Sequence, residues 1–146
     1  MPSREYQIAQ AARDLLAANT SAVAVEITPW WTDVEQGDTD LPRIKLDYVV
    51  STQGKARDDL IEDVILTVTY QAVIATESGW RLQGDALSEE LRTALPPPAG
   101  LVMRGWPNFV HEVMPMDRRV AIARTRSSIV EAVARYRVRF TNATGA

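Results

Sequence analysis

Apolar and polar residues alternate through the last third of the chain with the period of a β-strand. In the run SIVEAVARYRVRFTN, which starts at Ser128, one parity is apolar and the other carries Arg135, Arg137 and Arg139. Successive side chains of a strand point to opposite faces of a sheet, so this spacing predicts one buried face and one face lined by guanidinium groups. Three arginines in a row predict a partner surface for protein or nucleic acid. A plain solvated sheet face is the alternative.

The rest of the pattern predicts two helices and four more strands. Apolar residues recur at helical spacing over residues 3–19, which Ser3 can cap, and over residues 80–95, where three prolines follow. Alternation predicts strands at 22–28, 43–51, 60–76 and 109–124, the last interrupted near Pro115. The order α-β-β-β-α-β-β predicts a single α+β domain over residues 1–146, with a mainly antiparallel sheet of hairpin pairs covered on one face by two helices.

Two polar segments are expected to project from this domain. Residues 29–42 form an acidic loop bounded by prolines, and residues 52–59 form the tip of the hairpin between the second and third strands. The adjacent Trp30 and Trp31 are unusual in a loop, and we expect them to cap the edge of the core or to meet a neighbouring molecule.

Charge is unevenly distributed along the 146 residues. Residues 1–100 hold 8 basic and 16 acidic side chains, a net charge of −8, whereas residues 101–146 hold 8 arginines and 3 acidic side chains, a net charge of +5. This asymmetry favours head-to-tail or ring association between copies, since the acidic part of one copy can face the basic part of the next. Neutralisation within a single fold is the alternative.

Residues typical of enzyme active sites or metal sites are scarce. The chain has no cysteine and a single histidine, His111, next to Glu112; strand neighbours point to opposite faces, so these two are not expected to form a joint site. The acidic residues at 33–40 lack the spacing of a calcium loop. We expect neither an enzyme nor a bound metal or cofactor. No signal-peptide pattern and no apolar run of about 20 residues is seen, so a soluble protein made in the cytoplasm, without a membrane partner, is expected.

Several segments together resemble the tail-terminator, or tail-completion, proteins of long-tailed bacteriophages. They are SREYQIAQAARDLLAA, LPRIKLDYVV, LIEDVILTVTYQAV, ALSEELRTAL and VARYRVRFTN, and they span nearly the whole chain. The resemblance implies a structural virion protein that forms a hexameric ring on the end of the tail tube and stops its polymerisation. It also implies docking of the tail to the neck of the head, with DNA passing through the channel.

The resemblance further implies partners and site residues. The partners are other copies of the chain, the tail tube protein, a head–tail connector or neck protein, and passing DNA, in the tail–neck region of a virion assembled in the host cytoplasm. The hairpin tip is the candidate for contact with the tube or channel, through Gln53, Lys55 and Arg57. The candidate subunit or tube interface joins Arg135, Arg137 and Arg139 with an acidic stretch, Asp58, Asp59, Glu62 and Asp63.

Three other functions remain open from the sequence. The first is a head–tail connector or adaptor component, which would bind portal or adaptor rings instead of tubes. The second is a soluble small-ligand-binding module whose apolar pocket is lined by tryptophans, Trp30, Trp31, Trp80 and Trp106. The third is a hydrolase, against which the absence of a visible nucleophile or base argues.

Overall fold

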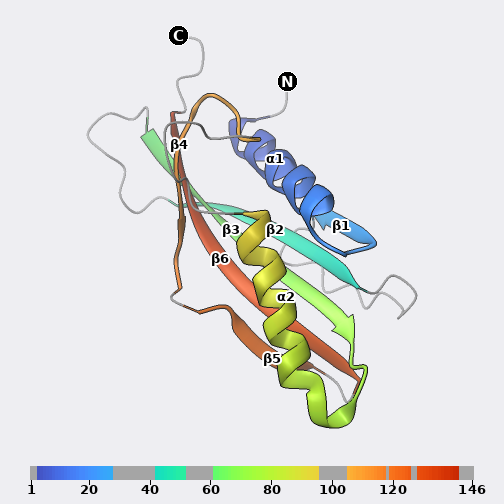
Figure 1. Cartoon of the computed structure of the whole chain (residues 1–146). Coiled ribbons are helices and arrows are strands. Elements are labelled where there is room, and N and C mark those ends of the chain that lie inside the picture. The colour runs from blue at the N-terminus through green and yellow to red at the C-terminus, as the bar shows by residue number, and fades with distance from the viewer. Residues whose placement is uncertain are drawn as a thin grey trace.

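The chain folds into one sheet with two helices packed on the same face (Figure 1). The computed structural model describes residues 3–27, 42–51, 61–95, 105–117, 119–125 and 128–141. The helices are α1 (Arg4–Asn19) and α2 (Trp80–Ala94), the latter preceded by the 3₁₀ turn η2 (Glu77–Gly79). The strands are β1 (Ala24–Ile27), β2 (Arg43–Ser51), β3 (Ile61–Val73), β4 (Val110–Pro115), β5 (Ala121–Thr125) and β6 (Ile129–Thr141). This confirms the predicted α+β class.

The first helix begins and ends at the residues that the sequence indicates. The Ser3 hydroxyl accepts a hydrogen bond from the amide nitrogen of Tyr6 at 3.2 Å, which satisfies one of the free donors of the first turn. At the other end, the side chains of Asn19 and Thr20 donate to the carbonyls of Leu15 and Leu16 at 2.8 Å and 2.6 Å. Both ends of α1 are therefore fixed by short polar side chains.

The second helix packs closely on the sheet because it carries a glycine at the contact. Gly84 is buried, and a methyl group at this position would overlap with Cγ2 of Ile122 on β5 and press on Val130 of β6. Glycine is unfavourable in a helix interior by about 1 kcal/mol relative to alanine. That cost is offset here by a shorter distance between helix and sheet.

The strand order is β1-β2-β3-β6-β4, and β5 also pairs with β6. The long central pairs are antiparallel, as predicted, with Ser51 opposite Asp63 and Val73 opposite Ile129. The sheet is mainly antiparallel, as predicted, and the exception is β1, which runs parallel to β2. Residues 28–42 connect these two strands. A connection of this length lets the chain run back so that β2 starts beside the start of β1 and pairs in parallel, which a tight turn does not allow.

The last edge of the sheet is divided into two short strands. β4 pairs with β6 from Phe140 to Tyr136, and β5 pairs with β6 from Val133 to Ile129, so both lie along the same edge. The predicted interruption near Pro115 is confirmed, since β4 ends at this residue. Proline has no amide hydrogen to donate, which ends the ladder at this point.

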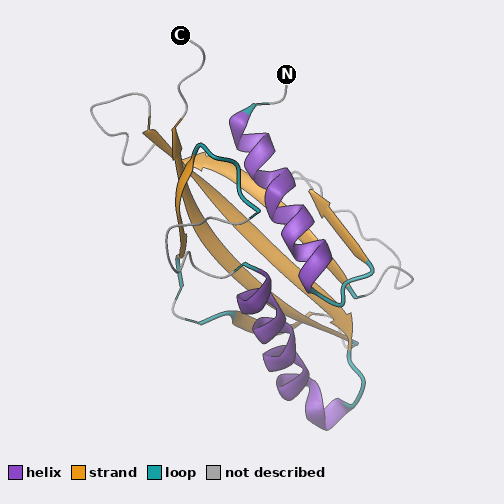
Figure 2. Cartoon of the chain, turned by 45° about the horizontal axis from the view of Figure 1, so that its top comes forward, coloured by secondary structure: helices purple, strands orange, loops and turns teal. Residues whose placement is uncertain are grey.

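The core lies between the helices and the even-numbered face of the two longest strands (Figure 2). α1 covers β1 and β2, while α2 covers β5 and β6. The largest fully buried side chains of this layer include Tyr70, Phe140, Ile8, Leu16, Ile44, Leu46, Leu66, Leu91 and Leu95. No helix covers the opposite face within the described residues, so that face, called the open face below, remains available for contacts.

Glu90 connects both helices to the sheet. One of its carboxylate oxygens accepts a hydrogen bond from the Tyr70 hydroxyl at 3.1 Å, and the other accepts from the amide nitrogen of Ser21 at 2.7 Å, just after α1. Burial, reinforced by the Glu90 charge, raises the pKa of Tyr70 well above its ordinary value. The phenol therefore stays protonated and continues to donate.

Candidate functional site

The three arginines of β6 lie on the open face, as their parity predicts. Arg135, Arg137 and Arg139 alternate with Tyr136 and Val138, which are buried under the helices. Arg137 and Arg139 each have register partners on both β3 and β4, so each stands in a row of side chains that crosses the sheet, whereas Arg135 has a register partner on β3 and lies where the other edge is interrupted. The surroundings of the three guanidinium groups differ, and this difference decides which of them is available to a partner.

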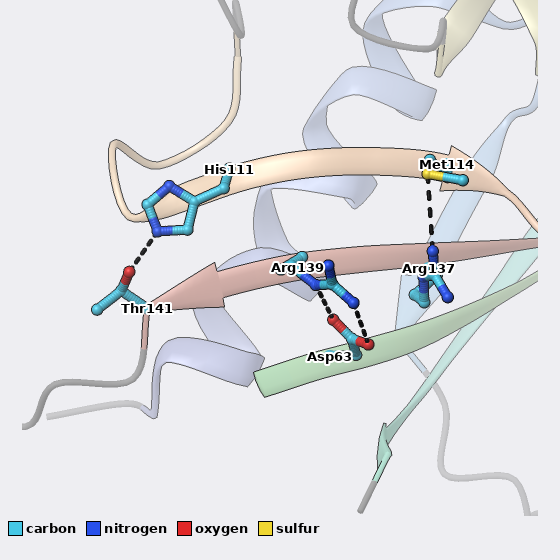
Figure 3. A network of polar contacts seen from close by, with 6 residues as sticks. All are labelled: Asp63, His111, Met114, Arg137, Arg139 and Thr141. Atoms are coloured by element: carbon cyan, nitrogen blue, oxygen red, sulfur yellow. Dashed lines mark hydrogen bonds and ion pairs between the residues drawn. The ribbon is translucent and has the colours of Figure 1, made fainter. Parts of the chain in front are cut away.

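Arg139 is held by a carboxylate of the neighbouring strand. Asp63 of β3 is its register partner, and two hydrogen bonds join the side chains: Nε to Oδ1 at 3.0 Å and a terminal guanidinium nitrogen to Oδ2 at 3.4 Å (Figure 3). Asp63 is only 6% exposed. The hydrogen bonds to this carboxylate, followed by its charge, raise the pKa of Arg139. The pair is therefore an internal element of the sheet.

Arg135 is paired on the other side of β6. Its Nε and a terminal nitrogen donate to the two carboxylate oxygens of Asp117 at 3.0 Å and 2.8 Å, a bidentate arrangement. These hydrogen bonds, with the Arg135 charge, hold the pKa of Asp117 below its ordinary value. Both side chains are partly exposed, so the pair is screened by water and contributes little to stability.

Arg137 has no acidic partner in the part of the chain that the structure describes. Its guanidinium donates only to the thioether sulfur of Met114, at 3.7 Å (Figure 3). The row that contains it is otherwise apolar, with Ile65 and Met114 as register partners on the two sides and Val49 beyond Ile65 on β2. Val49 is 49% exposed and Met114 is 38% exposed. Arg137 therefore stands as an uncompensated cation among exposed apolar side chains.

The acidic stretch predicted to face the arginines is divided by the sheet. Glu62 and Asp63 are strand neighbours, so they point to opposite faces, and of these two described residues Asp63 is the one on the face of the arginines. Asp58 and Asp59 lie outside the described residues, as do Gln53, Lys55 and Arg57 of the predicted hairpin tip and residues 29–41 of the acidic loop. The assignment of these residues to an interface stays a prediction.

The expectation that the side chains of His111 and Glu112 point to opposite faces of the sheet is wrong. A bulge lies between Val110 and Glu112, so simple alternation fails at this point and His111 is the extra residue. The His111 ring is hydrogen-bonded to the Thr141 hydroxyl, on the same side of the sheet as Arg139 (Figure 3). Within the described residues, no three side chains of the metal-binding types come together.

A polar row that the sequence does not reveal crosses the open face near the beginning of β6. Arg43 donates from Nε to the Gln71 side-chain oxygen at 3.0 Å, and the Gln71 amide nitrogen donates to Glu131 at 3.0 Å. The three residues are direct register partners on β2, β3 and β6. Only the strand register brings them together, so composition and periodicity alone could not have indicated this row.

A cavity of about 470 Å³ lies where the edge strand is interrupted. Its walls come from the end of α2, from the segment between β4 and β5, and from Ala134 and Tyr136 of β6. The alternative of a tryptophan-lined pocket stays a prediction, and two of its four tryptophans, Trp80 and Trp106, lie in the described part of the chain. Trp80 and Trp106 pack against the core, and neither lines this cavity. Trp30 and Trp31 lie outside the described residues.

Neither of the described helices has the length and apolar composition needed to cross a membrane. A scan against protein-family models gives no match to this chain, and a search of curated proteins finds no significant relative.

Proposed function

We propose that the chain is a structural protein of a long-tailed bacteriophage virion that closes into a ring on the tail tube, stops its growth and docks the tail to the neck. The proposal involves no catalysis and no cofactor. It joins the resemblance in the sequence to the surface that the fold leaves uncovered.

The observation that carries the proposal is the position of Arg137. An interface core combines exposed apolar side chains with a few arginines, and Val49, Ile65 and Met114 surround Arg137 in this way. Asp63 and Asp117 neutralise Arg139 and Arg135, so these two arginines shape the surface while Arg137 remains for an acidic partner. A surface of this kind is typical of a protein partner, because the row offers no aromatic side chain on which bases could stack.

The charge asymmetry of the chain supports a head-to-tail contact between copies. An acidic surface of one subunit can meet the arginine row of the next, and such an interface generates a ring when the rotation between subunits closes. Ring closure stops growth without chemistry. The same surface would serve a head–tail connector, which differs only in binding a portal or adaptor ring in place of a tube.

A small-ligand-binding module is the second candidate function. The cavity of about 470 Å³ favours it, since its volume lies within the range of about 300–1,000 Å³ found for small-molecule sites. The cavity lies at the sheet edge beside the end of α2, and it shares Arg135 and Asp117 with the arginine surface of the open face.

Electron microscopy of the purified protein, alone and mixed with tail tubes from the same source, tests the proposal. We expect sixfold rings, or caps on one end of tubes whose elongation then stops. The variant Arg137→Glu should abolish ring formation or capping, whereas Arg81→Glu, on an exposed position of α2 far from the open face, should not.

Two outcomes would overturn the proposal. A wild-type protein that stays monomeric and ignores tubes would remove the terminator function. Rings that bind portal or adaptor assemblies and do not stop tube elongation would show that the chain is a head–tail connector component instead. Normal capping by Arg137→Glu would keep the ring but show that the open face is not its interface.

A further inference from the structure

The cavity at the interrupted edge has the features of a ligand site that the assembly function does not use. Part of its lining is apolar, with Leu95 directly after α2, Val120 from the segment before β5 and Ala134 from β6. Ala134 is buried on the helix-facing side of β6, and its side chain is smaller than that of Tyr136, the next residue on this face, so space remains there. The interruption between Pro115 and Ala121 opens this space to the outside.

A tyrosine side chain contributes to the wall of this space. Tyr136 is 3% exposed and lines the cavity. Its hydroxyl can donate a hydrogen bond to a ligand that enters the cavity and offers an acceptor. Burial raises the pKa of Tyr136, so the phenol is a donor at neutral pH.

The charged groups of the cavity specify the sign of the ligand. Three arginines line it, Arg92, Arg119 and Arg135, against the single carboxylate of Asp117. Asp117 already holds Arg135 by two hydrogen bonds. Arg92 has only a long contact of 3.4 Å with Glu89, in which both side chains are exposed. Two cations therefore remain at the rim for an anionic group.

We propose that this cavity binds a small amphipathic carboxylate, with its apolar body against Leu95, Val120 and Ala134 and its carboxylate toward Arg92, Arg119 and the Tyr136 hydroxyl. Guanidinium groups bind carboxylates by charge-assisted, often bidentate hydrogen bonds, and the apolar walls favour a planar or branched hydrocarbon body. This site is distinct from the centre of the proposed ring interface, Arg137, although Arg135 and Asp117 border both.

Isothermal titration calorimetry of the full chain with 2-naphthoate tests the proposal, with the neutral 2-naphthamide as the matched control ligand. We expect one saturable 2-naphthoate site per chain and at least roughly tenfold weaker binding of the amide, since one charge-assisted contact is lost. Arg92→Gln should weaken naphthoate binding about tenfold, whereas Arg81→Gln on the same helix should leave it unchanged.

A second pair of variants tests the location. Ala134→Leu fills the cavity and should abolish binding, whereas Ala121→Leu, on the exposed side of β5, should not. Thermal unfolding by circular dichroism checks that both variants fold. Absence of saturable binding, equal affinity for acid and amide, or wild-type affinity in a folded Ala134→Leu would each overturn the proposal. Failure of naphthoate to bind, combined with loss of tube capping in Ala134→Leu, would assign the cavity to a protein side chain instead.

Discussion

Arg137 and Arg139 lie two residues apart on one face of one strand, and we predict that they respond in opposite ways to the same substitution. Arg139→Met leaves the Asp63 carboxylate, whose side chain is 7% exposed, without its partner. Removing one partner of a fully buried pair costs about 3–5 kcal/mol. The Arg139 side chain is 40% exposed, so water screens the pair, and we expect a loss of about 2 kcal/mol.

Arg137→Met removes only a contact of 3.7 Å with the Met114 sulfur, so the free energy of unfolding should change by less than about 0.5 kcal/mol. Urea denaturation followed by tryptophan fluorescence measures both variants under identical conditions. The assembly assay should give the reverse order, with Arg137→Met impaired and Arg139→Met affected only through its lower stability.

A double variant checks the physical reason. Asp63→Leu combined with Arg139→Met replaces both members of the pair by apolar groups, and we expect it to recover most of the stability that Arg139→Met loses. Equal losses of stability for Arg137→Met and Arg139→Met would refute the claim that the Asp63–Arg139 pair is structural. So would a double variant whose loss of stability equals the separate losses of Asp63→Leu and Arg139→Met added together.

Three further predictions concern the helix layer. Gly84→Ala should lower the free energy of unfolding by about 1 kcal/mol, because overlap with β5 outweighs the gain in helix propensity; urea denaturation beside the exposed control Ala86→Gly measures this, and a stabilised variant would contradict it. Since burial, and then Glu90, raise the pKa of Tyr70 in the folded state, its contribution to stability should be complete below about pH 10 and fall above it as the unfolded chain ionises; Tyr70→Phe should show a shallower fall above about pH 10, and equal slopes would count against a raised pKa of Tyr70. Ser3→Ala should cost about 1 kcal/mol in thermal unfolding, and an unchanged midpoint would exclude a role for the cap.

The sequence predicts those parts of the fold that depend on periodicity within one segment. The bounds of β2 agree with the prediction, and β6 has the predicted buried and arginine-bearing faces, because period-two alternation over long strands has a single interpretation. The cap at Ser3 and the interruption at Pro115 follow from the chemistry of single residues.

The features that the sequence does not predict depend on strand register and on pairing between distant segments. Asp63 pairs with Arg139, and not with an arginine two residues away, because β3 and β6 align at that register. The parallel direction of β1 and the bulge at His111 are set by the packing of the whole sheet. The cavity likewise requires an interrupted strand, a small residue on β6 and the end of α2 to meet in space.

The division of the outer edge into β4 and β5 also limits how copies of this chain can associate. An uninterrupted edge strand exposes a continuous row of amide and carbonyl groups, and such rows allow sheets to join edge to edge into fibres of unlimited length. Here that edge offers only two separate stretches, residues 110–115 and 121–125, and the opposite edge in the described part of the chain is the four-residue β1. Indefinite sheet extension is therefore disfavoured at both margins, which agrees with the proposal that copies associate through side chains of the open face.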